Sequence, residues 1–127
     1  MIKLPNGVNV NNLIDDLRNF SWEAADLLLF YSKIIKKSDR RNEIIQTKNN
    51  EDPVTLADLE VNKLIINRIQ EKYQKINWEI LSEENVKVKP NYCDTNVDWC
   101  WVLDPLDGTK DFIQGTGNYA MHLALNY

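Results

Sequence analysis

An apolar stretch that runs directly into two aspartates constrains the fold of this chain more than any other feature. Residues 99–112 read WCWVLDPLDGTKDF. A short apolar run bounded by turn residues is typical of a buried strand, and Asp104, Pro105 and Gly108 mark a bend directly after it. The sequence therefore predicts a buried strand that stops at Asp104, a turn, and a helix that begins near Thr109.

The bend after this strand has the residue types of a site for a cation and a phosphate. Asp104 and Asp107 are separated by a proline that can turn both carboxylates to one side, together with the Leu106 carbonyl. Hard divalent cations bind oxygen ligands of this kind. Gly108 and Thr109 stand at the expected helix start, where free N–H groups favour a phosphate. An ordinary turn explains the same residues, because Asp, Pro and Gly are common turn formers.

Two earlier segments supply further polar residues. LSEEN provides Glu83 and Glu84 at the end of a short predicted strand, where their carboxylates could converge with Asp104. PVTLAD provides Thr55 and Asp58, which have the spacing of a helix capping box. Capping is the simpler explanation of Asp58, but a carboxylate fixed in a first helical turn is also well placed to orient a water. Both roles are compatible.

Two amphipathic helices and several short strands complete the expected fold. Apolar residues recur at helical spacing from Asn11 to about Lys37, with Asn11 or Asn12 as the cap. A second helix is expected from Thr55, and its inward residues are Leu56, Leu59, Leu64, Ile65, Ile69 and Tyr73. Strands are expected at 43–48, 78–81 and 120–127, and a loop or weak hairpin at 85–98.

Composition places the chain among soluble globular proteins and excludes some partners. Fifteen basic and nineteen acidic residues give a net charge of −4, which argues against a nucleic-acid or anionic-membrane surface. Cys93 and Cys100 lack metal-type spacing and are interpreted as reduced thiols. The N-terminal residues have no apolar signal core. We therefore expect one cytoplasmic domain of 127 residues.

One rival motif is excluded by the sequence. Phosphatases of the haloacid dehalogenase type also end a buried strand in D-x-D-G-T, and the first aspartate is their nucleophile. Counting back from Asp107, that position is Pro105, which cannot form an aspartyl phosphate.

Three ordered motifs resemble a known family. K-x(4)-P-V-T-x-A-D, then S-E-E, then W-V-L-D-P-L-D-G-T-K-D-F, from Lys48 to Phe112, are similar to the magnesium-dependent phosphatases of the inositol monophosphatase family. The resemblance implies an α+β fold. It corresponds to the N-terminal half of the layered α/β/α/β/α sandwich of the inositol monophosphatase and fructose-1,6-bisphosphatase type.

The resemblance also implies roles for individual residues. Magnesium would be held by Glu83, Asp104, Asp107 and the Leu106 carbonyl. Asp58 and Thr109 would orient and deprotonate the attacking water, and the N–H groups of Gly108 and Thr109 would hold the phosphate. Glu84 would act on the metal ligands without binding the metal itself, and Lys48 would lie near a weaker third metal site. The implied reaction is direct attack of a metal-activated water on a phosphomonoester.

The substrate is a finer question. D-G-T-K-D-F looks more like the 3'(2'),5'-bisphosphate nucleotidase branch, so Lys110 indicates a substrate such as adenosine 3',5'-bisphosphate. An ordinary surface lysine is an equally good explanation, and inositol 1-phosphate is the alternative substrate. No membrane or nucleic-acid partner is expected.

The chain departs from the family in length. Members are about twice as long, and their second half carries another metal-binding aspartate in a W-D-x-A segment, which this sequence lacks. Residues 1–127 are therefore expected to form a metal-binding domain that is incomplete at its C-terminal end and inactive alone. Pairing with a C-terminal half, or self-association, is expected. A non-catalytic interaction module that keeps half of the fold is the alternative of another class.

Single aromatic and histidine residues receive structural interpretations. Trp22, Trp78, Trp99 and Trp101 lie in apolar contexts and are expected in the core. His122, the only histidine, is expected to pack or hydrogen-bond within the last strand.

Overall fold

Helices and strands are interspersed along the chain, and the computed structural model describes them over residues 3–36, 45–47, 53–88 and 97–127. Their order is α1 (Val10–Ile35), β1 (Ile45–Thr47), β2 (Pro53–Thr55), α3 (Leu56–Lys72), β3 (Glu79–Ser82), α4 (Glu83–Val88), β4 (Cys100–Asp107), α5 (Thr109–Gln114) and β5 (Ala120–Asn126). The predicted α+β class is confirmed.

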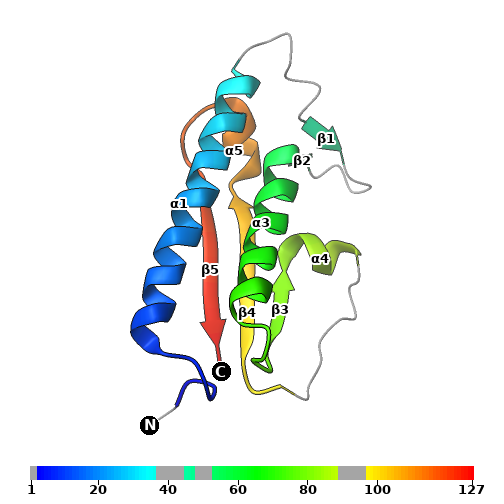
Figure 1. The fold of residues 1–127 in the computed structure, drawn as a ribbon. Helices are drawn as coiled ribbons and strands as arrows, with labels where there is room; N and C mark the ends of the chain where they lie inside the picture. The colour runs from blue at the N-terminus through cyan, green and yellow to red at the C-terminus, as the bar shows by residue number, and fades with distance from the viewer. Residues whose placement is uncertain (1–2, 37–44, 48–52, 89–96) are drawn as a thin grey trace.

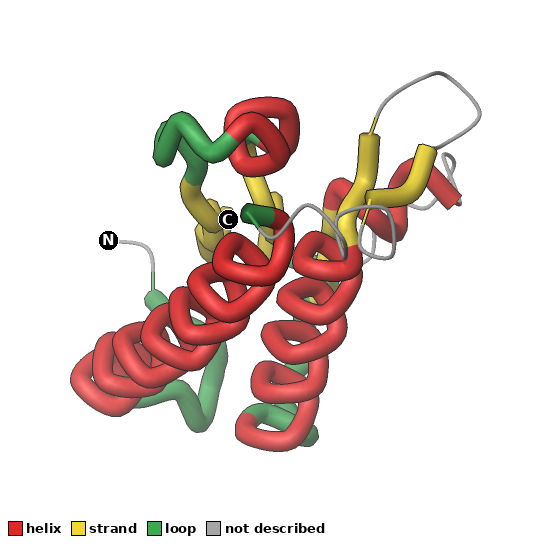
Figure 2. Tube along the Cα trace, turned by 90° about the horizontal axis from the view of Figure 1, so that it is seen from above, coloured by secondary structure: helices red, strands yellow, loops and turns green. Residues whose placement is uncertain are grey.

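The main sheet has the strand order β3-β4-β5, with β3 parallel to β4 and β5 antiparallel to β4. The two long helices, α1 and α3, lie side by side against one face of this sheet (Figures 1 and 2). Because β3 and β4 are parallel, their carboxyl ends meet at the same edge of the sheet, and α4 and α5 follow there. A separate hairpin of β1 and β2 leads into α3.

The core lies between the helix pair and the sheet. Its fully buried members come from all three parts: Leu13, Phe20, Ala24, Leu28 and Ile35 of α1, Ala57, Val61, Ile65 and Ile69 of α3, and Trp101, Leu103, Leu106 and Phe112 of the β4–α5 region. The prediction for Leu59 was wrong, since this side chain is exposed. The buried face of α3 runs through residues spaced by four from Ala57, and Leu59 is half a turn away from them.

Both long helices begin with a side-chain cap. Helix α1 starts at Val10, and its cap is Asn9, not Asn11 or Asn12, because Asn9 Oδ1 accepts hydrogen bonds from the backbone N–H groups of those two residues at 3.0 and 3.1 Å. The capping box of α3 is confirmed: Thr55 and Asp58 exchange hydrogen bonds between side chain and backbone.

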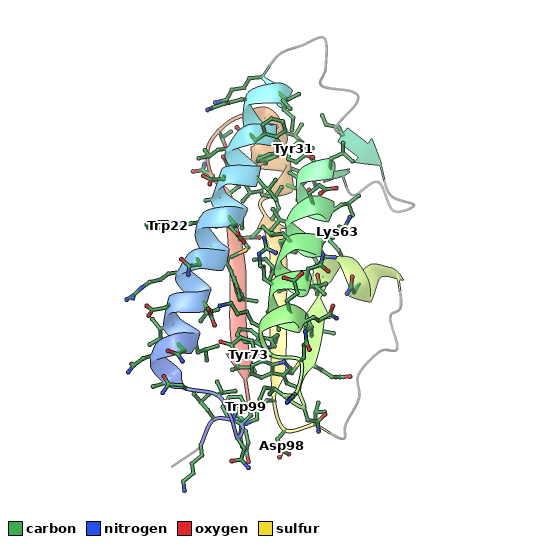
Figure 3. All side chains as sticks on the ribbon, in the orientation of Figure 1. Trp22, Tyr31, Lys63, Tyr73, Asp98 and Trp99 are labelled. Atoms are coloured by element: carbon green, nitrogen blue, oxygen red, sulfur yellow. The ribbon has the colours of Figure 1, made fainter. Side chains whose placement is uncertain are left out.

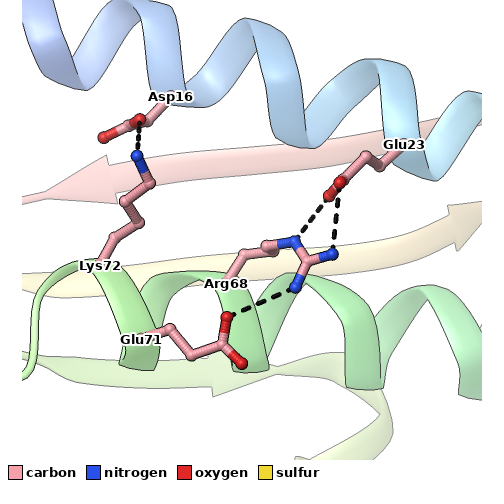
Figure 4. A network of polar contacts seen from close by, with 5 residues as sticks. All are labelled: Asp16, Glu23, Arg68, Glu71 and Lys72. Carbon is pink, nitrogen blue, oxygen red and sulfur yellow. Dashed lines mark hydrogen bonds and ion pairs between the residues drawn. The ribbon is translucent and has the colours of Figure 1, made fainter.

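Ion pairs link α1 to α3 (Figure 4), and the Tyr73 phenol adds a hydrogen bond between them. Arg68 donates hydrogen bonds to both carboxylate oxygens of Glu23 at 2.8 and 3.2 Å, and Lys72 forms an ion pair with Asp16 at 3.1 Å. The Tyr73 hydroxyl donates to the same Asp16 at 2.6 Å. Burial, followed by the contact with Asp16, raises the pKa of Tyr73 above its ordinary value. The exposed pair of Arg68 with Glu23 fixes the pairing of the two helices more than it stabilises it, because exposed ion pairs contribute little.

Two expected boundaries were wrong at the edge where the helices follow the strands. Strand β4 does not stop at Asp104 but continues to Asp107, with a register irregularity between these residues. Pro105 lies in this irregularity, where a missing N–H costs no ladder bond. Residues 83–88 form α4, so the part of the expected loop that covers 85–88 is helical instead, and residues 89–96 lie outside the described residues. The predicted strand at 43–48 is confirmed over Ile45–Thr47.

The tryptophan prediction was wrong for one residue. Trp101 is fully buried, and Trp78 and Trp99 are half-buried, but Trp22 is 76 % exposed. Figure 3 shows Trp22 pointing from α1 away from α3 and the sheet. The helical period explains this, since Trp22 lies two positions from both Phe20 and Ala24 of the buried face. Within the described residues, no helix combines the length and apolar character needed to cross a membrane.

Candidate active site

Side chains from four separate segments converge at the carboxyl ends of β3 and β4. Glu83 and Glu84 follow β3 at the start of α4, and Asp104 and Asp107 lie in the last part of β4. The first turn of α3, with Asp58, and the start of α5 lie beside them (Figure 1). The prediction that these carboxylates come from neighbouring strand ends agrees with this arrangement.

Asp104 is the centre of the carboxylate group. Burial raises its pKa most, and the next causes are a hydrogen bond to the Glu83 side chain and the charge of Glu83. Asp107 raises it further, while the Leu106 N–H, 3.2 Å from Asp104 Oδ1, lowers it. The net result is a pKa of about 6. Two carboxylates that share a proton in this way show that negative charge is crowded here.

Asp58 and Thr109 form a second polar group beside the first. The Thr109 hydroxyl lies 3.1 Å from Asp58 Oδ1 and 3.1 Å from the Leu106 carbonyl oxygen. The other carboxylate oxygen of Asp58 accepts from the Thr55 N–H at 2.9 Å and from its hydroxyl at 2.6 Å. Sequence reasoning left capping and a water-orienting role open for Asp58, and the geometry accommodates both, one on each oxygen.

Asp58 is also an unusual carboxylate electrostatically. It is only 2 % exposed, and burial is the largest cause that raises its pKa. The hydrogen bonds from Thr55 oppose the rise, the nearby charge of Glu84 adds to it, and the Thr109 hydrogen bond opposes it again. A buried carboxylate with a raised pKa is a better proton acceptor than an exposed one.

Gly108 makes the turn between β4 and α5 possible. Its φ of 82° lies in the left-handed region, and a Cβ at this position would stand 2.6 Å from the backbone oxygen of Asn118. Only glycine meets both conditions without strain. The glycine of the D-G-T motif therefore fixes where Thr109 enters α5 and, through it, the contact with Asp58.

An open cavity of about 610 Å³ lies over the sheet face next to the carboxylates. Glu83, Asp104 and His122 contribute its polar wall, and side chains of β3, β4 and β5 contribute an apolar one. His122 was predicted to pack or to hydrogen-bond; it is exposed and therefore not packed, and its Nε2 lies 3.7 Å from Asp107 Oδ2. The register pair Asp104 and His122 explains how β5 delivers this residue to the site.

The donor set fits a hard divalent cation in its chemistry. Oxygen atoms of Glu83, Asp104 and Asp107 are the candidate ligands, and a cation would offset the charges of Glu83 and Asp107, which add to burial in raising the pKa of Asp104. No group of three His, Cys, Asp or Glu side chains in the part of the chain described here already has the arrangement of a metal site.

Three further residues were predicted at the site. Glu84 is buried, 4 % exposed, and its charge acts on Asp58. Lys110 is exposed in the first turn of α5. Lys48 lies outside the described residues.

The sequence reasoning missed two polar residues, Asn62 of α3 and Ser82 of β3, which are hydrogen-bonded to each other next to the glutamates. The only signal for Asn62 was its spacing of four from Asp58 on one helix face.

Comparison with known proteins defines the class. The sequence profile of the inositol monophosphatase family matches residues 16–127. The chain belongs to the inositol monophosphatase family, as the three motifs predicted.

Two curated relatives represent two branches of the family. A 3'(2'),5'-bisphosphate nucleotidase CysQ of Aggregatibacter actinomycetemcomitans is 30% identical over 115 residues, which are 90% of this chain and 39% of the relative. An inositol-1-monophosphatase of Bacillus subtilis (strain 168) is 35% identical over 92 residues, which are 72% of this chain and 33% of the relative. The chain thus spans two fifths or less of the length of either relative.

The fold agrees with solved structures of the family. A calcium-bound IMPase family protein from Staphylococcus aureus superimposes with a TM-score of 0.67 at 22% identity, over 94% of this chain and 41% of that one. At this identity the likeness shows the fold alone. The predicted inositol monophosphatase type of fold is confirmed.

Proposed function

We propose that this chain is the metal-binding part of a magnesium-dependent phosphomonoesterase. One observation carries the proposal: Leu106 joins the two polar groups, because its N–H donates to Asp104, the partner of Glu83, and its carbonyl oxygen lies 3.1 Å from the Thr109 hydroxyl that contacts Asp58. Glu83, Asp104, Asp107 and the Leu106 carbonyl would hold the cation. When bound there, magnesium supplies positive charge that lowers the pKa of a water and offsets charge on the phosphate.

Asp58 and Thr109 would handle the proton of the attacking water. The Thr109 hydroxyl already points one hydrogen bond at Asp58, at 3.1 Å. In this proposal the Thr109 oxygen accepts a proton from the water while its own proton moves to Asp58. The raised pKa of Asp58 favours this transfer. Thr55 holds the other oxygen of Asp58, so the carboxylate keeps its orientation throughout.

The phosphate would lie at the start of α5. The N–H groups of Gly108 and Thr109 are the proposed donors, and Gly108 is required for the turn that carries them, because of its positive φ and its close approach to Asn118. Lys110, exposed in the same turn, can reach a second phosphate of the substrate. Glu84 would act indirectly, through its charge on Asp58. Lys48 is proposed near a weaker cation site.

We infer a 3'(2'),5'-bisphosphate nucleotide as the substrate. The nucleotidase relative matches 90% of the chain, against 72% for the inositol-1-monophosphatase, although the latter is more identical over its shorter match. Inositol 1-phosphate is therefore the second candidate. Lys110 separates the two, because only the nucleotide has another phosphate. The proposed partner is thus a small phosphorylated molecule, and the proposed location is the cytoplasm.

A non-catalytic module is the candidate of another class. It is favoured by length, since the chain spans 33% to 39% of the two curated relatives. If the remaining part of the fold is needed for the leaving group, residues 1–127 would bind the cation and turn over little. A C-terminal half or a second copy would then be the partner.

Isothermal titration calorimetry, with magnesium and then with adenosine 3',5'-bisphosphate as the titrant, tests the proposal. We expect weak magnesium binding, nucleotide binding that requires magnesium, and loss of both in Asp107→Asn. Asp26→Asn, at an exposed position on α1, removes the same charge away from the site and should change neither. Nucleotide binding that is unaffected by magnesium and by Asp107→Asn would contradict the proposal.

The substrate is tested in a completed chain. Residues 1–127 joined to the C-terminal part of the Aggregatibacter relative should hydrolyse adenosine 3',5'-bisphosphate with a higher kcat/KM than inositol 1-phosphate. Lys110→Ala should narrow this difference by raising KM for the nucleotide alone. A clear preference for inositol phosphate would overturn the inference from Lys110.

A further inference from the structure

Asn62 of α3 joins the two residues that flank the glutamates. The Ser82 hydroxyl, fully buried at the end of β3, donates to the Asn62 side-chain oxygen. The Asn62 side-chain nitrogen donates to the side-chain oxygen of Asn85 in α4 at 3.2 Å. Asn62 therefore holds the chain immediately before Glu83 and immediately after Glu84.

The position of Asn62 on α3 connects this contact to the other half of the site. Asn62 follows Asp58 by four residues, which is about one helical turn, so both side chains leave the same face of α3. Asp58 accepts from Thr109, after β4, and Asn62 accepts from Ser82, at the end of β3. One rigid helix thus fixes both strand ends relative to each other.

The distance between those strand ends decides how the carboxylates meet. Glu83 directly follows Ser82, and Asp104 directly follows Leu103, the parallel partner of Ser82 in the sheet. The hydrogen bond between Glu83 and Asp104 depends on this register. A small displacement of the first turn of α4 would move Glu83 away from Asp104 and leave the pairing of β3 with β4 intact.

We propose that Asn62 is a positioning residue: by holding Ser82 and Asn85, it keeps the Glu83 carboxylate next to Asp104 and so sets the affinity of the site for a divalent cation. It does not touch the cation. The inference rests on the proposed function, because it takes Glu83 and Asp104 as cation ligands. Changes of residues that orient metal ligands typically weaken metal binding by about tenfold to a hundredfold.

The alternative role of Asn62 is purely structural, and the two roles differ in what they change. A structural contact would alter the stability of the cation-free chain and leave the cation affinity as it is. A positioning contact alters the affinity itself. Asn67, exposed on the same helix, provides a matched control, since Asn67→Ala makes the same change in helix propensity away from the site.

The test is Mn²⁺ binding, measured by electron paramagnetic resonance on the purified chain, with urea unfolding in EDTA measured in parallel. Asn62→Ala should weaken Mn²⁺ binding about tenfold, and Asn67→Ala should not change it. Ser82→Ala should weaken Mn²⁺ binding as well. The variant that combines Asn62→Ala and Ser82→Ala should lose less affinity than the product of the two single losses, because both changes remove one contact.

Each outcome has a definite meaning. If Asn62→Ala does not fold, Asn85→Ala, which removes only the exposed hydrogen bond, should weaken Mn²⁺ binding several-fold, and an unchanged affinity overturns the inference. Equal Mn²⁺ affinity of wild type and a folded Asn62→Ala overturns the inference but leaves the proposed function standing. If the wild type binds no Mn²⁺, both the inference and the proposed function are wrong.

Discussion

Replacing Asp104 by asparagine should stabilise the chain when no cation is present. In the folded chain, burial and the neighbouring Glu83 and Asp107 raise the pKa of Asp104 from 3.8 to about 6. A fully buried group with a shift of this size would lose about 3 kcal/mol of folding free energy on ionisation. Asp104 is only partly buried, so solvent screening reduces the expected loss to about 1 kcal/mol.

The pH dependence follows from the direction of the shift. Between pH 3.8 and about 6 the folded chain binds more protons at Asp104 than the unfolded chain does. The stability contributed by the neutral form is therefore fully present below pH 3.8 and is lost as the pH rises through about 6. Asp104→Asn cannot ionise and keeps that stability, so its advantage over the wild type should grow from pH 4.5 to pH 8.

Thermal unfolding in EDTA measures this advantage. At pH 8 we expect a Tm about 4 °C higher for Asp104→Asn, which corresponds to about 1 kcal/mol for a domain of this size. Asp26→Asn on α1 is the control and should show no such gain. In 20 mM magnesium the Tm difference between Asp104→Asn and the wild type should shrink or change sign, because only the wild type keeps the full ligand set. A variant that is less stable than the wild type in EDTA at pH 8 would refute the reasoning.

Three other predictions concern the turn, the core and activity. Gly108→Ala should lower the free energy of unfolding by about 2 kcal/mol or more in urea, because of its positive φ and the 2.6 Å approach to Asn118; a loss below about 0.5 kcal/mol would contradict this. Ile65→Ala should lower the free energy of unfolding by about 3 kcal/mol, and Arg68→Lys should lower it by less than about 1 kcal/mol. Equal losses would mean that ion pairs dominate the helix pairing. Residues 1–127 alone should show negligible phosphate release, and magnesium-dependent release that Asp107→Asn abolishes would disprove that.

The elements with strong periodicity could be predicted, and their ends could not. The buried face of α1 was visible in the spacing of Leu13, Phe20 and Ala24. The cap was misplaced by two or three residues, because Asn9, Asn11 and Asn12 are chemically equal candidates and only the fold selects among them. Leu59 was assigned to the core from its apolarity, but the phase of α3 is set by which residues face β4.

The residues that gather at the candidate site could be predicted from the sequence, but the contacts between them could not. The D-P-x-D-G-T motif located Asp104 and Asp107, and local patterns pointed to Glu83 and Asp58. Three features depend on strand register and on contacts between distant segments, which no local pattern encodes. These are the continuation of β4 beyond Asp104, the exposure of His122 beside the cavity, and the hydrogen bond between Asn62 and Ser82.

The central claim is that Glu83, Asp104 and Asp107 hold one divalent cation. The most direct measurement is a crystal structure of the chain grown with Mn²⁺, with an anomalous difference map recorded at the manganese edge. We expect one strong peak about 2.2 Å from carboxylate oxygens of Glu83, Asp104 and Asp107 and from the Leu106 carbonyl oxygen. An ordered map without a peak between these residues, or a peak held by other side chains, would contradict the account.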